Sequence, residues 1–187
     1  YSEYPLVPVD AWPSIVDYYL QAAPDKSLPQ ADKESVRLGL DQFEVFKPAY
    51  RTPMPFTTLV KIDTARGWIY VGDSADNSLA VLDKQGKVLQ KIASIPSPVA
   101  ISIRPDEDWI LSIGSVFPSD NPQGKLIALQ KEKGELSFPP RDILAGLSRP
   151  TFTSYADLNN DGLQDIVVSG FGYLVGHFSW FENMADG

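Results

Sequence analysis

Three segments of this chain share one layout, and this internal repeat constrains the fold more than any other feature. Each segment has a short apolar strand, a turn and a second strand rich in β-branched residues. The segments cover residues 59–72, 100–114 and 152–170, and Pro55, Pro98 and Pro150 introduce them. Short strands in units that recur about every 40–50 residues are typical of β-propeller blades, whose neighbouring sheets bury each other's faces.

A third strand follows the pair in every segment, and a fourth follows in the first two. These additional strands are predicted at residues 79–82 and 88–92, at 126–129 and 136–138, and at 178–181. The sequence therefore predicts an all-β fold of consecutive four-stranded antiparallel blades, about three in number, the last without its fourth strand. Closed propellers have roughly four to eight blades, so we expect a partial propeller from a longer protein.

The N-terminal part of the chain has a different pattern. Apolar residues lie at the spacing of one helix face, at Trp12, Ile15, Val16, Tyr19 and Leu20. Asp10 is placed to cap this short helix, and Pro24 to end it. Residues 1–35 are therefore predicted as a helix and a linker, and residues 36–187 as the propeller blades. We expect one or two outer strands within residues 36–50.

Composition excludes several classes of function. The chain has 24 acidic and 16 basic residues and a formal net charge of −8, whereas a nucleic-acid-binding surface needs basic patches. It contains no cysteine, which excludes thiol nucleophiles and zinc–thiolate sites within it. No apolar run approaches the roughly 20 residues that span a membrane. We therefore expect neither a nucleic-acid partner nor a membrane span.

The residues that could support catalysis are few. His177 is the only histidine, and a Ser–His–Asp or metal–histidine site would depend on it alone. Aspartates at strand ends, such as Asp63 and Asp73, have the spacing of ordinary turns. No glycine-rich motif leads from a strand into a helix, so no phosphate-binding loop is predicted. We therefore expect a chain that is not an enzyme.

The turn at residues 157–165 differs from the turns of the other two segments. Oxygen-bearing side chains alternate along it at Asp157, Asn159, Asp161 and Asp165. Calcium takes about six to eight oxygen ligands, and a short loop with this pattern, a glycine at Gly162 and the Leu163 carbonyl can wrap around it. Val168 stands where an EF-hand has its bidentate Glu, and the β-branched run 166–168 predicts a strand instead of a helix. The loop is therefore predicted to bend a β-hairpin; the alternative is an Asx-rich turn without a metal.

This part of the sequence resembles an FG-GAP or VCBS-type repeat. The resemblance rests on the loop, on the strand after it, on Phe171-Gly172 and on residues 176–183. Such repeats form calcium-binding blades of β-propellers, including the head of integrin α-subunits. The resemblance implies that one Ca²⁺ is bound by Asp157, Asn159, Asp161, the Leu163 carbonyl and Asp165. Asn159 stands where the pattern often has an acid.

Two classes of function remain open. The first is a non-catalytic, calcium-stabilised extracellular propeller fragment that serves as a binding or scaffold domain for a protein or carbohydrate. It would be secreted, periplasmic or on the cell surface, in a bacterium. The alternative is the propeller portion of a larger secreted enzyme, redox or polysaccharide-acting, whose catalytic module lies outside this chain. The incomplete last blade also predicts an exposed edge that self-associates or pairs with residues 36–46.

Overall fold

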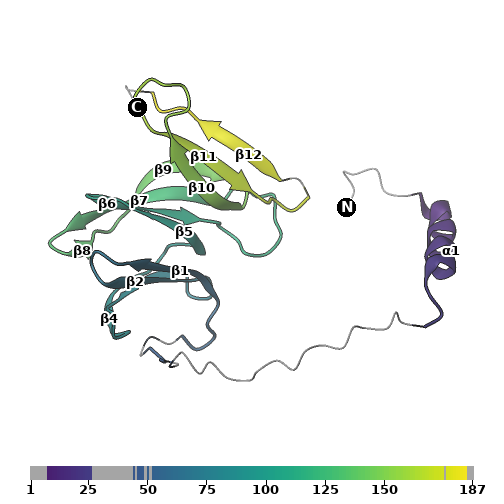
Figure 1. Cartoon of the computed structure of the whole chain (residues 1–187), viewed down its shortest axis with the longest axis horizontal. Coiled ribbons are helices and arrows are strands. Elements are labelled where there is room, and N and C mark those ends of the chain that lie inside the picture. The colour runs from purple at the N-terminus through teal and green to yellow at the C-terminus, as the bar shows by residue number, and fades with distance from the viewer. Residues whose placement is uncertain are drawn as a thin grey trace. The chain divides into compact units, whose positions relative to one another are not determined.

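The fold is taken from a computed structural model, which describes residues 8–26, 44, 46–48, 50, 52–174 and 176–184. The chain divides into two compact units, Tyr1–Val45 and Phe46–Gly187 (Figure 1). The predicted outer strand within residues 36–50 falls mostly outside the described residues, and residues 46–48 and 50 are not in a strand. The two units are described separately below.

The described part of the first unit contains one helix, as predicted. A 3-10 turn at Val9–Ala11 leads into α1, Trp12–Ala22, and a proline in the first turn is tolerated because its missing N–H has no helical partner there. The prediction that Asp10 caps the helix was wrong. Asp10 lies within the 3-10 turn, so Ala11 takes the N-cap position and no side chain caps it. Within the described residues, no helix has the length and apolar character to cross a membrane.

The second unit begins with a four-stranded antiparallel sheet, which confirms the first predicted set of strands. Its strands follow each other in chain order as β1 (Thr57–Asp63), β2 (Trp68–Asp73), β3 (Ser78–Leu82) and β4 (Val88–Ile92). The first hairpin pairs Asp63 with Trp68, so its turn is the one expected at residues 64–67. The outer strands β1 and β4 are exposed over much of their length, whereas β3 is buried at every position.

The second sheet confirms three of its four predicted strands. They are β5 (Pro98–Ile103), β6 (Glu107–Ser112) and β7 (Gly124–Glu132). The fourth strand was predicted at residues 136–138, and the structure confirms it at Leu136 only. There the short β8 (Glu135–Leu136) pairs only with the end of β7, because Pro139 and Pro140 cannot donate to a ladder. A fifth strand that was not predicted, β9 (Arg141–Leu147), also pairs with β7.

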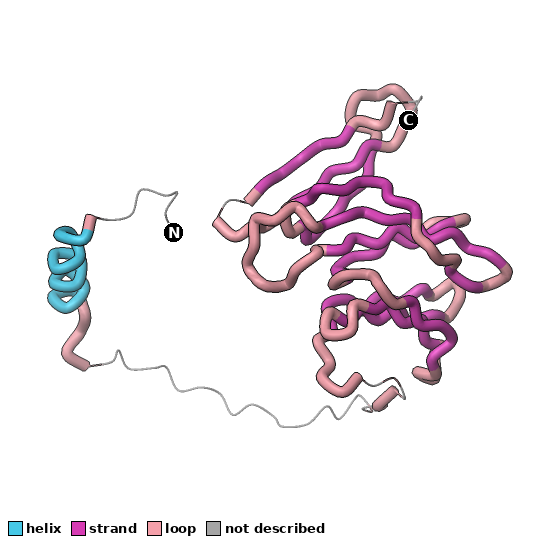
Figure 2. The backbone as a smooth tube through the Cα atoms, turned by 180° about the vertical axis from the view of Figure 1, so that it is seen from behind, coloured by secondary structure: helices cyan, strands magenta, loops and turns pink. Residues whose placement is uncertain are grey.

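The third sheet has three strands in the described part of the chain. They are β10 (Pro150–Ala156), β11 (Asp165–Gly170) and β12 (His177–Phe181), in that order. All three were predicted, and β12 forms an edge of the sheet among the described residues. Figure 2 shows the strands of the second unit as successive layers. The described residues thus give a mostly β fold of antiparallel sheets and do not form a closed propeller.

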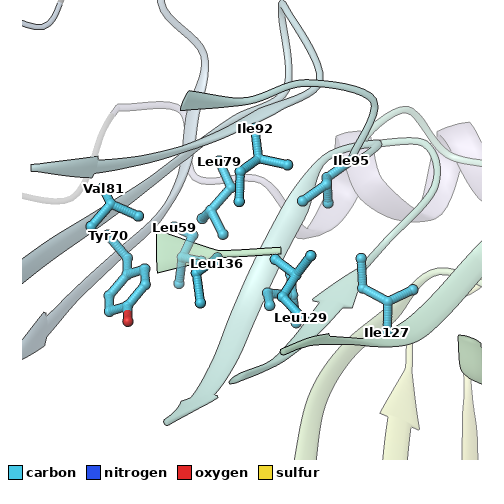
Figure 3. Packing of buried hydrophobic residues seen from close by; sticks show 10 residues of the cluster. Leu59, Tyr70, Leu79, Val81, Ile92, Ile95, Ile127, Leu129 and Leu136 are labelled. Carbon is cyan, nitrogen blue, oxygen red and sulfur yellow. The ribbon is translucent and has the colours of Figure 1, made fainter. Parts of the chain in front are cut away.

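Hydrophobic residues fill the spaces between neighbouring sheets. Between the first and second sheets, Tyr70, Leu79 and Val81 face Ile127 and Leu129 (Figure 3). Between the second and third, the buried cluster consists of Leu111, Leu126, Leu147, Ile166 and Val168. Each strand therefore alternates its side chains between two faces, and one face of each sheet packs against the next sheet.

Candidate metal centre

The loop between β10 and β11 holds the predicted calcium ligands. It bends a hairpin, as expected, because Ala156 at the end of β10 pairs with Asp165 at the start of β11. Two residues of the loop have left-handed backbone conformations, Asn160 with φ 61° and Gly162 with φ 86°. Glycine adopts this conformation without strain and asparagine tolerates it, so both residue types suit so tight a turn.

The side chains of Asp157, Asn159 and Asp161 turn inward onto the backbone of the loop. Asp157 Oδ1 and Asn159 Oδ1 accept the same N–H, that of Asp161, at 3.2 and 3.1 Å. Asp157 Oδ2 accepts the Gly162 N–H at 2.9 Å, and Asp161 Oδ1 accepts the Leu163 N–H at 2.7 Å. Oxygens of three side chains therefore lie on the inside of one turn, and two of these oxygens accept the same N–H group.

Glu182 is a further carboxylate beside this loop, and the sequence analysis missed it. The Asn159 amide group donates both to Asp161 Oδ2, at 2.9 Å, and to Glu182 Oε1, at 2.8 Å. Glu182 reaches the loop because β12 pairs with β11, with Phe181 opposite Ile166. The register of that pairing is the signal that could have identified it, because the residue after Phe181 must lie near the start of β11.

Asp165 lies at the base of the loop and is fully buried. Its Oδ1 accepts the Asn183 N–H at 2.9 Å, and its Oδ2 accepts the Leu158 N–H at 3.0 Å. These N–H groups, that of Asn183 above all, hold the pKa of the Asp165 carboxyl below its ordinary value. Asp165 thus connects the loop to the end of β12, while the other predicted ligands lie nearer the tip.

The lowered pKa of Asp165 predicts an acid-sensitive contribution to stability. A carboxyl whose folded pKa is depressed stabilises the protein above its unfolded pKa, about 3.9, and this contribution is lost as the pH falls through the folded pKa. We expect Asp165→Asn to lower the urea midpoint clearly at pH 7 and much less at acid pH. Asp106→Asn, in an exposed turn, is the matched control. A deficit in Asp165→Asn that is equal at both pH values would contradict this role.

Arg104 ties the loop to the second sheet. Its Nη2 donates to Gln164 Oε1 at 2.8 Å, at the end of the loop. Its guanidinium carbon lies 3.6 Å from the ring centroid of Trp109 and 4.7 Å from that of Tyr155. Such cation–π contacts are favourable, and the two rings also meet edge to face, with centroids 5.3 Å apart. The loop is therefore held from β12 on one side and from the second sheet on the other.

The donor set of the loop suits a hard cation. Among the residues that the structure describes, no three His, Cys, Asp or Glu side chains form a metal-binding group. The loop instead offers carboxylates together with an amide oxygen and a backbone carbonyl, the mixture that calcium accepts. A carboxylate oxygen that accepts one N–H keeps a second lone pair for another partner. The Asn159 amide hydrogens, which carry partial positive charge, already lie between two carboxylates.

The other candidate residues have the contacts of strand ends and turns. Asp63 Oδ1 accepts the N–H groups of Ala65 and Arg66 at 2.9 and 3.1 Å, and its Oδ2 pairs with Arg66 Nη1 at 2.7 Å. Asp73 Oδ1 accepts the Ala75 N–H at 2.8 Å in the same way. His177 begins β12 opposite Gly170, and a side chain at Gly170 would collide with the imidazole ring.

The sequence matches no protein-family model and no curated protein. The likeness of residues 157–183 to FG-GAP repeats is thus a likeness of residues and spacing alone.

Proposed function

We propose that this chain is a calcium-stabilised part of a β-propeller of the FG-GAP or VCBS type. It acts as a non-catalytic binding or scaffold domain. It works outside the cytosol, as a secreted, periplasmic or cell-surface protein. The observation that supports it most is the convergence of Asp157, Asn159, Asp161 and Glu182 around one hairpin turn. Around them lie antiparallel sheets, whose surfaces would bind a protein or carbohydrate.

The calcium ion has a structural role in this proposal. Asp161 and Glu182 accept hydrogen bonds from the same Asn159 amide group, and Asp157 accepts the Asp161 N–H, so negative charge gathers along this turn when no cation is present. A bound calcium ion would neutralise this charge and fix the start of β11. Glu182 supplies the carboxylate that the loop lacks at Val168. The affinity expected for such a site is roughly 10⁻⁴ to 10⁻³ M, which suits a compartment rich in calcium.

Thermal unfolding in the presence and absence of calcium tests this proposal. An ion that binds only the folded state raises stability by about 1.4 kcal/mol at ten times its Kd. For a unit of this size, that corresponds to a rise in Tm of about 3–6 °C. Asp161→Ala removes a central ligand from an exposed loop and should abolish the rise. An equal calcium response in the two proteins, or none in the parent, would mean that the loop is an Asx-rich turn only.

Glu182→Gln separates the role of the neighbouring strand from that of the loop. Glutamine keeps an oxygen that can accept the Asn159 amide hydrogen, so the fold without calcium should be unchanged. The variant loses one charge near the ion, so we expect a several-fold weaker response to calcium than in the parent. Glu135→Gln, at an exposed position on β8, is the matched control. A full calcium response in Glu182→Gln would remove Glu182 from the site.

A further inference from the structure

Arg104 connects the second sheet to the third through two aromatic rings. Its guanidinium group lies against Trp109 of β6 and Tyr155 of β10, and its Nη2 donates to Gln164 Oε1 at 2.8 Å. Its Nε is buried, and no atom of the described residues accepts a hydrogen bond from it. A buried N–H without an acceptor is costly, and the favourable contact of the charge with the rings offsets part of this cost. The two rings therefore fix the guanidinium group, which donates from this position to Gln164.

The backbone of Arg104 is fixed to the second sheet. Its N–H donates to Asp108 Oδ1 at 3.3 Å, and its carbonyl accepts a hydrogen bond from Lys131 Nζ. Asp108 is fully buried and Lys131 is nearly so, and the two form an ion pair. Because both members of this pair hold the backbone of Arg104, its side chain extends to the loop at residues 157–165 from a fixed point.

Gln164 lies in this loop between two of the proposed calcium ligands, the Leu163 carbonyl and Asp165. Its own carbonyl accepts a hydrogen bond of 3.3 Å from Asn183 Nδ2, and its side chain accepts the one from Arg104. An ion bound by both neighbours would restrict the backbone of Gln164, and with it the place of the side chain. Calcium and Arg104 would therefore restrict the same residue.

We propose that Arg104 is a positioning residue for the calcium loop, and that it couples calcium binding to the packing of the second sheet against the third. This inference rests on the proposed calcium site. Such a coupling is reciprocal: if the ion strengthens the contact of Arg104 with Gln164, the contact strengthens calcium binding by the same factor. We expect a factor of about five, the lower end of typical couplings, because this hydrogen bond is exposed to water.

A double-mutant cycle on calcium affinity tests the coupling. Gln164→Met removes the acceptor and leaves every charge in place, whereas Arg104→Met removes the donor together with a positive charge that repels the ion. We expect Gln164→Met to raise the Kd for calcium about five-fold in the parent, and to leave it unchanged in the Arg104→Met background, where the contact is already absent. Titration with calcium, followed by NMR chemical shifts, measures these Kd values. Gln85→Met, at an exposed position in the turn between β3 and β4, is the matched control and should leave the Kd unchanged.

Hydrogen exchange at the Nε–H of Arg104 gives a second readout, which does not need the Arg104→Met variant. Without calcium, Gln164→Met should already speed this exchange, because the guanidinium group loses one of its contacts. Calcium should slow the exchange in the parent but not in Gln164→Met. The Nε–H of Arg66, in the turn between β1 and β2, should not respond to calcium in either protein.

The outcomes separate this coupling from the calcium site itself. A parent that does not bind calcium overturns both. A parent that binds calcium overturns the coupling alone if Gln164→Met leaves the Kd unchanged, or raises it equally in both backgrounds. An exchange rate at the Arg104 Nε–H that calcium does not change in the parent has the same meaning. Circular dichroism confirms that each variant is folded.

Discussion

Asp108→Ala is expected to lower the free energy of unfolding by about 3–5 kcal/mol. Asp108 is fully buried, and its Oδ1 lies 2.5 Å from Lys131 Nζ. Its Oδ2 accepts a hydrogen bond of 2.7 Å from the hydroxyl of Tyr70, which belongs to the first sheet. The substitution leaves a nearly buried ammonium group and a buried hydroxyl without this carboxylate, and such groups are costly when uncompensated.

Urea denaturation of Asp108→Ala and of Tyr70→Phe separates the two parts of this effect. Burial, together with the neighbouring Asp108 carboxylate, raises the pKa of Tyr70 far above its usual value, so its hydroxyl stays a donor. Tyr70→Phe removes only the hydrogen bond from the Tyr70 hydroxyl to Asp108 and should cost about 1–3 kcal/mol. Asp106→Ala, two residues away in the exposed turn, is the control. A loss below about 1 kcal/mol in Asp108→Ala would contradict the buried network.

Leu129→Ala is expected to cost about 2–5 kcal/mol, because it leaves a cavity between the first two sheets. Leu129 is fully buried on β7 and packs in the cluster shared by both sheets. The matched control is Leu89→Ala on β4, where the leucine is 48% exposed and loses little contact. Chemical denaturation measures both variants. Equal losses in the two would mean that the sheets do not pack face to face as described.

The strand pattern could be predicted from the sequence wherever alternation and turn chemistry agreed. The hairpin β1–β2 is an example, since a β-branched strand ends at Asp63 and Gly67 supplies a left-handed turn position, with φ 67°. In the second sheet the fourth strand was predicted too long and β9 was missed, for a physical reason. Leu136 and Phe138 alternate like a strand, but prolines follow them, while β9 begins with the polar Arg141 and Asp142. Residues 141–147 form a strand because they pair with β7, and a local sequence pattern does not show which segment pairs with β7.

The candidate site could be predicted only in part. The spacing of Asp157, Asn159 and Asp161 was visible in the sequence, because all three lie in one short loop. Glu182 was not, since its place beside Asn159 depends on the register between β11 and β12. The contacts of Arg104 with Trp109 and Gln164 were missed for the same reason, because they connect two sheets. Spacing within a loop is local information, whereas neighbours from other strands follow from tertiary structure.

Isothermal titration of the calcium-free protein with calcium is the most direct test of the proposed function. We expect one ion per chain with a Kd of roughly 10⁻⁴ to 10⁻³ M, and no measurable binding in Asp161→Ala. Magnesium should compete poorly, because it demands a smaller and more regular shell of ligands. The absence of calcium binding in the parent, or an unchanged affinity in Asp161→Ala, would contradict the account.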